Sequence, residues 1–306
     1  MRHGPAVNRK LVGRSSPRAL VVDQVQTPSS GGHRGRRLGI RRACLIGGVI
    51  AVSGLALGVA VVVGRGQSPS PTGCNFASTA TSAQFSITPT QAQNAAIIAA
   101  VAMRKGMPDH AVTVALAASL QETQLRNLPY GDLDSVGLFQ QRPSQGWGTS
   151  TQIMDPSYAA SAFYDHLAQV PGWQTIAVTD AAQLVQHSAT PDAYANWETE
   201  ARSLATALTG QVPAGLSCRL NGFGGLAPPP SALAQASAQE MGAQLLGVPV
   251  STKTGWRVAT WAVAHAYNYH INSVSFEGRT WTGPSGTWSP IAGSESGTPQ
   301  NTVNVS

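Results

Sequence analysis

One acidic side chain stands at the end of an apolar helical segment and is followed by a loop rich in glycine and aspartate. Residues 112–120 repeat small or apolar residues at the spacing of one helical face, and Glu122 falls at the border of that face. A carboxyl group there is partly removed from water, which raises its pKa because the neutral form is favoured. Such a group can donate a proton to a leaving oxygen. The pattern indicates a general acid for glycosidic bond cleavage; the alternative is a solvated glutamate at a frayed helix end.

The loop after this glutamate carries further short groups of residues at a defined spacing. In order, they are Glu122-Thr123, Gly131-Asp132 and Gly137-Leu138-Phe139-Gln140. This order resembles the signature of the lysozyme-like superfamily, especially soluble lytic transglycosylases and goose-type lysozymes. Those families carry a catalytic Glu, usually followed by Ser, then a Gly-rich turn and Gly-Leu-Met-Gln or Gly-Leu-Phe-Gln.

A second, weaker resemblance lies at residues 187–197, which are similar to the lytic transglycosylase pattern Tyr-Asn-Ala-Gly-Pro-x-x-Val-x-x-Trp. Ala189, Pro191 and Trp197 occupy matching places. His187 stands where the family has the Tyr that helps to orient the catalytic acid, and Ser188 where it has Asn. Together the two resemblances cover about residues 86–210. They imply a mainly helical domain with a small β-turn lobe that lines the substrate.

The resemblance implies an enzyme that cleaves the β-1,4 bond between N-acetylmuramic acid and N-acetylglucosamine in peptidoglycan, with Glu122 as general acid and base and without a metal or cofactor. A transglycosylase needs only this carboxylate, whereas a hydrolase of inverting geometry uses a second one to place water. Asp132 lies one position short of the acidic residue of goose-type enzymes, and Asp134 is the substitute. Both side chains equally suit an Asx turn beside the loop glycine.

The same resemblance assigns four side chains to substrate binding: Asp134, Gln140, His187 and Tyr194. The competing interpretation is a non-catalytic wall-binding or scaffold protein of an envelope machine, because folds outlive their chemistry. The substitution of the family Tyr by His187 keeps that alternative open.

The positive charge of the chain is concentrated at its beginning. Residues 1–42 hold ten Lys or Arg and one acid, and they read as a basic, disordered cytoplasmic tail. Residues 75–217 hold five basic and ten acidic residues. A basic groove for phosphate contacts is therefore not expected there, which argues against nucleic acid as a partner.

Residues 43–64 form an uncharged, apolar run. As a helix this run spans about 30 Å, the thickness of the hydrocarbon core of a bilayer. The preceding arginines favour a cytoplasmic N-terminus and an extracytoplasmic remainder. We expect a single-pass signal anchor in the cell membrane; a cleaved signal peptide is the alternative, although no Ala-x-Ala site follows the run.

Two cysteines, Cys74 and Cys218, bracket the segment that resembles lysozyme-like domains. In an oxidising compartment such a pair suggests a disulfide that ties the ends of one domain together. The alternative is two unrelated thiols. Neither cysteine has a neighbouring cysteine or histidine pair that suits a metal site.

The remaining segments complete the expected organisation. Residues 65–85 are rich in Ser, Thr and Pro and read as a linker, and residues 211–230 as a second, Gly/Pro-rich linker. Residues 231–292 are expected to form a small α+β module of unknown role. Residues 293–306 are expected to be a disordered tail. The expected fold class is therefore mainly α, with one transmembrane helix before the lysozyme-like domain and the small module after it.

Overall fold

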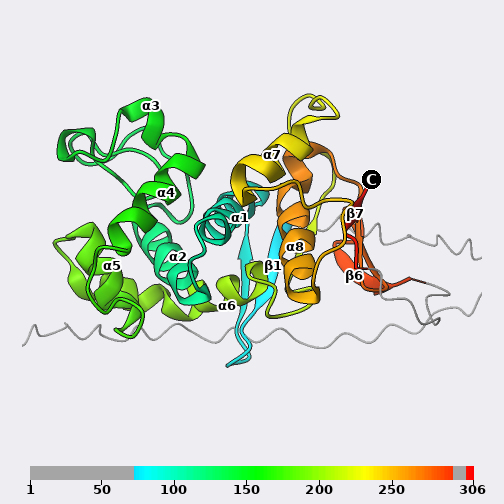
Figure 1. Ribbon diagram of the computed structural model, residues 1–306, viewed down its shortest axis with the longest axis horizontal. Coiled ribbons are helices and arrows are strands. Elements are labelled where there is room, and N and C mark those ends of the chain that lie inside the picture. Colours follow the sequence, from blue (N-terminus) through cyan, green and yellow to red (C-terminus); the bar gives the residue numbers. More distant parts are fainter. Residues whose placement is uncertain (1–71, 292–300) are drawn as a thin grey trace, which may run out of the picture. The chain divides into compact units, whose positions relative to one another are not determined.

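The computed structural model describes residues 72–291 and 301–306. These residues belong to one compact unit, which spans Gly64 to Ser306 (Figure 1). Of the described residues, 46% are helical and 15% lie in strands. The expectation of a mainly α fold is therefore wrong, and the fold is mixed. The strands at residues 73–77 and 216–219 were not expected, because they pair with each other across a long separation in sequence; the strands between residues 273 and 290 lie in the expected α+β module.

The helical part is built around α1 (Pro89–Arg104) and α2 (Asp109–Thr123). A capping box between Thr88 and Gln91 starts α1, with Pro89 in its first turn. Residues 111–120 of α2 are all buried, so the expected single apolar face is not observed. The reason is that helices pack around α2: α1, α4 (Pro156–Leu167), α5 (Val178–Gln186) and α6 (Glu198–Leu208).

The segment between α2 and α4 takes the place of the expected β-turn lobe. It contains the 3₁₀ helix η1 (Pro143–Gln145) and the short helix α3 (Ser150–Ile153). Its β structure consists of two isolated bridges, Leu128 with Gly137 and Val136 with Gln141. A second 3₁₀ helix, η2 (Pro191–Trp197), joins α5 to α6.

A three-stranded antiparallel sheet joins the two ends of the helical part, in the order β2-β1-β3. Its strands are β1 (Gly73–Ala77), β2 (Gln84–Ile87) and β3 (Leu216–Arg219). Cys74 lies opposite Cys218 in this sheet, and their sulfur atoms are 2.08 Å apart. The predicted disulfide is confirmed.

Both segments that were expected to be linkers contribute to this sheet. Residues 65–85 include β1 and the start of β2, and residues 211–230 include β3. In β1 the side chains of Cys74 and Phe76 are buried and their neighbours are not. This alternation over five residues is too short to stand out in a Ser/Thr/Pro-rich sequence, which explains the error.

The last part of the chain packs on the helical part. It comprises α7 (Ala232–Met241), α8 (Thr252–Tyr269) and a sheet in the order β6-β5-β4-β7. The strands are β4 (Ser273–Phe276), β5 (Arg279–Thr282), β6 (Thr287–Pro290) and β7 (Asn304–Val305). Helix α8 contacts α1, and Trp256, Phe276 and Trp281 fill the core beside it. Strand β7 belongs to the tail that was expected to be disordered; it is ordered because it pairs with β4.

Within residues 72–291 and 301–306, no helix has the length and apolar character that a membrane span requires. The expected signal anchor, residues 43–64, and the basic tail, residues 1–42, lie outside the described residues. The described fold therefore contains no transmembrane element.

Candidate active site

The end of α2 places Glu122 one residue before the helix terminus. Gln124 and Leu125 follow with φ values of 54° and 60°, in the left-handed region that ends a helix. The side chain of Leu125 is fully buried and fixes the new direction of the chain. The helix therefore stops directly after Glu122, so this carboxyl group emerges at the edge of a buried helix and is half-buried itself.

Two hydroxyl groups on α2 fasten the Gly-Leu-Phe-Gln loop to the helix. Thr123 Oγ1 donates to the carbonyl oxygen of Leu138 at 2.9 Å, and Ser119 Oγ lies 3.2 Å from the same oxygen. Gly137 has a φ of 81°, and a Cβ atom at this position would lie 2.8 Å from the carbonyl oxygen of Ile153. The glycine is thus required by both conformation and space. These contacts bring the loop alongside Glu122.

Two side chains from α5 and η2 donate hydrogen bonds to one oxygen of this glutamate. Tyr194 Oη lies 2.8 Å from Glu122 Oε1, and Gln186 Nε2 lies 3.4 Å from the same atom. Gln186 Nε2 also donates to the carbonyl oxygen of Phe139 at 2.8 Å. Glu122 Oε2 accepts no hydrogen bond from any residue that the structure describes. One carboxyl oxygen is therefore held in place, and the other has no hydrogen-bond partner among the described residues.

The surroundings of this carboxyl group favour its protonated form. Burial raises the pKa of Glu122, and the hydrogen bonds from Tyr194 and Gln186 offset part of that increase. No second carboxylate contributes to the change. The pKa of Tyr194 is itself raised, by burial and by the charge of Glu122, so its hydroxyl keeps its proton and remains a donor.

The tyrosine beside the acid is not at the position that the resemblance indicated. His187 occupies the family's Tyr position, but in the structure it ends α5 with a φ of 52° and its side chain is exposed. Tyr194, seven positions later in the sequence, is fully buried and supplies the hydroxyl. Trp197, which the weaker resemblance includes, donates its indole N–H to Gln121 Oε1 at 2.8 Å, directly beside Glu122 in sequence.

Asp134 does not lie in a catalytic arrangement. It accepts hydrogen bonds from Arg142 Nε at 2.7 Å and from the backbone N–H of Ser144 at 2.7 Å. These donors lower the pKa of Asp134 well below its usual value. Asp134 is therefore a structural residue that closes the loop between residues 134 and 144.

Asp132 is exposed, and within the described part of the chain its carboxylate makes no hydrogen bond or ion pair. Gln140 donates from Nε2 to the carbonyl oxygens of Tyr130 and Gly137, at 3.3 and 3.2 Å. The expected second carboxylate is thus not linked to Glu122, and Gln140 shapes the loop that passes it.

Three residues at the site had no role assigned from the sequence: Ser119, Thr123 and Gln186. Thr123 occupies the place where the resembling families usually have Ser, so this position offered a signal for the hydroxyl that holds the loop. Gln186 belongs to no motif, because it reaches Glu122 from 64 residues away. Only the packing of α5 against α2 reveals it.

Comparison with known proteins adds no family assignment: no protein-family model matches the chain, and a search of curated proteins finds no significant match.

Proposed function

We propose that this protein cleaves the β-1,4 glycosidic bond between N-acetylmuramic acid and N-acetylglucosamine in peptidoglycan, with Glu122 as general acid and base. The observation that carries the proposal is the asymmetric setting of this carboxyl group. Oε1 is held by Tyr194 at 2.8 Å, whereas Oε2 has no partner among the described residues. Burial raises the pKa of Glu122, which suits a group that must hold a proton until substrate arrives.

In the proposed reaction Glu122 donates its proton to the bridging oxygen, and the bond from that oxygen to the anomeric carbon breaks. Positive charge develops at the anomeric carbon as the leaving sugar departs with the proton. The ionised Glu122 then accepts a proton from the attacking hydroxyl group. Tyr194 and Gln186 stabilise this ionised state because both donate hydrogen bonds to Oε1.

The attacking hydroxyl belongs to water in a hydrolase and to C6 of the muramic acid in a transglycosylase. The carboxylate of Asp134 is bound by Arg142 and Ser144, and the exposed carboxylate of Asp132 accepts no hydrogen bond in the described structure. This arrangement favours a mechanism with one carboxylate, in which the C6 hydroxyl attacks and a 1,6-anhydro end forms.

The disulfide between Cys74 and Cys218 supports a location where peptidoglycan is found. Disulfides of this kind form and persist in oxidising, extracytoplasmic compartments and are rare in the cytosol. The enclosed helical part is thus suited to work outside the cytoplasm.

The test is mass spectrometry of the fragments that the purified full chain releases from peptidoglycan, with Glu122→Gln as the matched variant. The substitution preserves shape and removes the proton donor, so we expect release to fall about 10²–10⁴-fold while the circular dichroism spectrum is unchanged. Equal release by a folded Glu122→Gln protein would refute the role of this residue. Binding without release by the wild-type chain would instead favour a wall-binding protein.

A further inference from the structure

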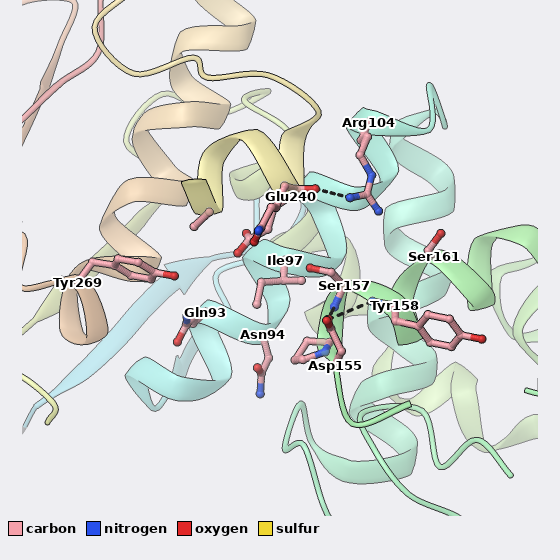
Figure 2. A pocket seen from close by; sticks show the side chains of 13 residues that line it. Gln93, Asn94, Ile97, Arg104, Asp155, Ser157, Tyr158, Ser161, Glu240 and Tyr269 are labelled. Carbon is pink, nitrogen blue, oxygen red and sulfur yellow. Dashed lines mark hydrogen bonds between the residues drawn. The ribbon is translucent and has the colours of Figure 1, made fainter. Parts of the chain in front are cut away.

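A hollow of about 870 Å³ lies where α1, the start of α4, α7 and the end of α8 meet (Figure 2). Its lining includes neither Glu122 nor the side chains that contact it. Two of its walls, α7 and α8, lie beyond residue 210 and so outside the region of resemblance. The volume falls within the roughly 300–1,000 Å³ typical of small-molecule sites.

Glu240 lines one wall of the hollow and is paired with the buried side chain of His265. Glu240 is 7% exposed and accepts a hydrogen bond from Trp261 Nε1 at 2.6 Å. Nδ1 of the fully buried His265 lies 2.8 Å from the carbonyl oxygen of Trp261, so this nitrogen is the donor. Nε2 of His265 then faces Glu240 Oε2 at 3.2 Å.

The other charged side chains of the hollow balance each other. Arg104 donates to the backbone carbonyl of Gln239. Asp155 accepts from the backbone N–H groups of Ser157 and Tyr158 at 2.8 and 3.2 Å, as the N-cap of α4. One cation faces one anion, so the hollow favours a neutral, polar ligand over a nucleotide or a polycation.

Two neighbouring amides on α1, those of Gln93 and Asn94, line the hollow, and each has one polar atom without a partner among the described residues. Gln93 Oε1 accepts from the side-chain amide of Asn268, which leaves Gln93 Nε2 without a partner among the described residues. Asn94 is 5% exposed, and its Nδ2 donates to the carbonyl oxygen of Leu125 at 2.8 Å. Its Oδ1 accepts no hydrogen bond from any described residue and is therefore a free acceptor. An acetamido group carries the complementary pair, a carbonyl acceptor and an N–H donor.

The remaining lining suits a sugar ring. Ile97 provides an apolar surface between the polar side chains, and the ring of Tyr269 extends toward the middle of the hollow (Figure 2). Asn94 also lines an adjoining hollow of about 670 Å³ with Gln124 and Arg126, which follow Glu122 closely in sequence. The two hollows therefore meet at Asn94, on the side toward the end of α2.

We propose that the hollow lined by Gln93, Asn94, Glu240 and Tyr269 binds an N-acetylated sugar unit of a glycan, at a site separate from Glu122. The choice of a glycan rests on the proposed function, because the donor and acceptor pair by itself specifies only an acetamido group. Such a site holds the polymer while a different part of it is cleaved.

Two tryptophan indoles allow the two sites to be observed separately. The Trp261 indole contacts Glu240 in the hollow, and the Trp197 indole contacts Gln121 beside Glu122. The experiment titrates the tetramer of N-acetylglucosamine into the full chain carrying Glu122→Gln and ¹⁵N-labelled tryptophan. We expect both indole resonances to shift. The tetramer of glucosamine, which lacks acetyl groups, should leave Trp261 unchanged.

Gln93→Glu replaces the free donor by an acceptor, and Tyr269→Phe removes only a hydroxyl group. Each variant should raise the dissociation constant measured from the Trp261 resonance about tenfold. The dissociation constant measured from the Trp197 resonance should stay unchanged. Gln235→Glu, an exposed change on α7 outside the hollow, is the control of equal charge. If the Trp197 indole resonance shifts and the Trp261 resonance does not, the second sugar site is refuted and the proposed active site is not. If the Trp261 resonance shifts and the Trp197 resonance does not, the result would instead count against the proposed active site. A response of Trp261 to a wall stem peptide but not to the sugar tetramer would also refute the glycan assignment.

Discussion

The hydroxyl of Tyr194 donates a 2.8 Å hydrogen bond to Glu122 Oε1 across 72 residues of sequence. The helix that carries the acid ends one residue later, and the 3₁₀ helix that carries the tyrosine packs against it. This contact holds one carboxyl oxygen, and in the proposed mechanism the other oxygen transfers the proton. The pKa of Glu122 depends in part on this hydrogen bond.

Tyr194→Phe should reduce cleavage and shift its pH dependence. The hydroxyl lowers the pKa of Glu122, so its removal raises that pKa further. Because the general acid must be protonated, the alkaline limb of the pH–activity profile should move to higher pH. Loss of a hydrogen bond to a charged group costs about 1.5–3 kcal/mol, so we expect activity to fall about 10- to 100-fold. An unchanged limb in a folded variant would show that Tyr194 acts only in packing.

Glu122→Gln should raise the melting temperature at neutral pH while it removes activity. Burial raises the pKa of Glu122 in the folded state, so its ionisation costs stability as pH increases through that pKa. Glutamine avoids this cost and can still accept the hydrogen bond from Tyr194. The difference in melting temperature should shrink as pH falls below the ordinary value of 4.5, where the carboxyl group is protonated in both states. A variant that melts below the wild-type chain at neutral pH would contradict the burial argument.

The sequence predicted the half-buried glutamate at a helix end and the disulfide, because each depends on local spacing or on residue type. The capped start of α1 and the end of α2 near Gln124 follow from such signals. The bond between Cys74 and Cys218 followed from two cysteines that flank one segment. These features need little knowledge of which elements pack together.

The features that were missed depend on packing between distant segments. Tyr194 reaches Glu122 from η2 while His187 turns outward, and a match by sequence position alone could not separate these two residues. Strands β1 and β3 pair across the whole helical part, so their few alternating residues were read as linkers. The sequence of α2 indicated a single apolar face, but four other helices pack around α2 and bury it on all sides.

Removal of the disulfide should destabilise the fold without changing the active site. Cys74 and Cys218 are 144 residues apart and join strands at the base of the helical part. The chain-entropy model gives a stabilisation of about 4–5 kcal/mol for a loop of this length. Cys74→Ser and Cys218→Ser should lower the free energy of unfolding by similar amounts, and the double variant should add little. Chemical denaturation measures this; additive losses would contradict a shared bond.

Asp134→Asn should destabilise the loop beside Glu122. In the folded state Arg142 and Ser144 hold the pKa of Asp134 well below its usual value of 3.8. A depressed pKa contributes stability above the unfolded-state value and loses it as pH falls toward the folded-state value. The variant should therefore melt below the wild-type chain at neutral pH, and the two should converge in strong acid. Thermal unfolding monitored at several pH values measures both effects.

Asp132→Asn distinguishes a transglycosylase, which needs one carboxylate, from a hydrolase, which needs two. The Asp132 side chain is exposed, and its carboxylate has no hydrogen bond or ion pair in the described structure, so the melting temperature should not change. With one catalytic carboxylate, activity should stay within about threefold of wild type, since surface changes away from partners alter free energies by roughly 0.5 kcal/mol or less. Mass spectrometry should then find 1,6-anhydro ends among the products of both proteins. A large loss of activity, with reducing ends in the wild-type products, would show instead that Asp132 places the attacking water and that the enzyme is a hydrolase.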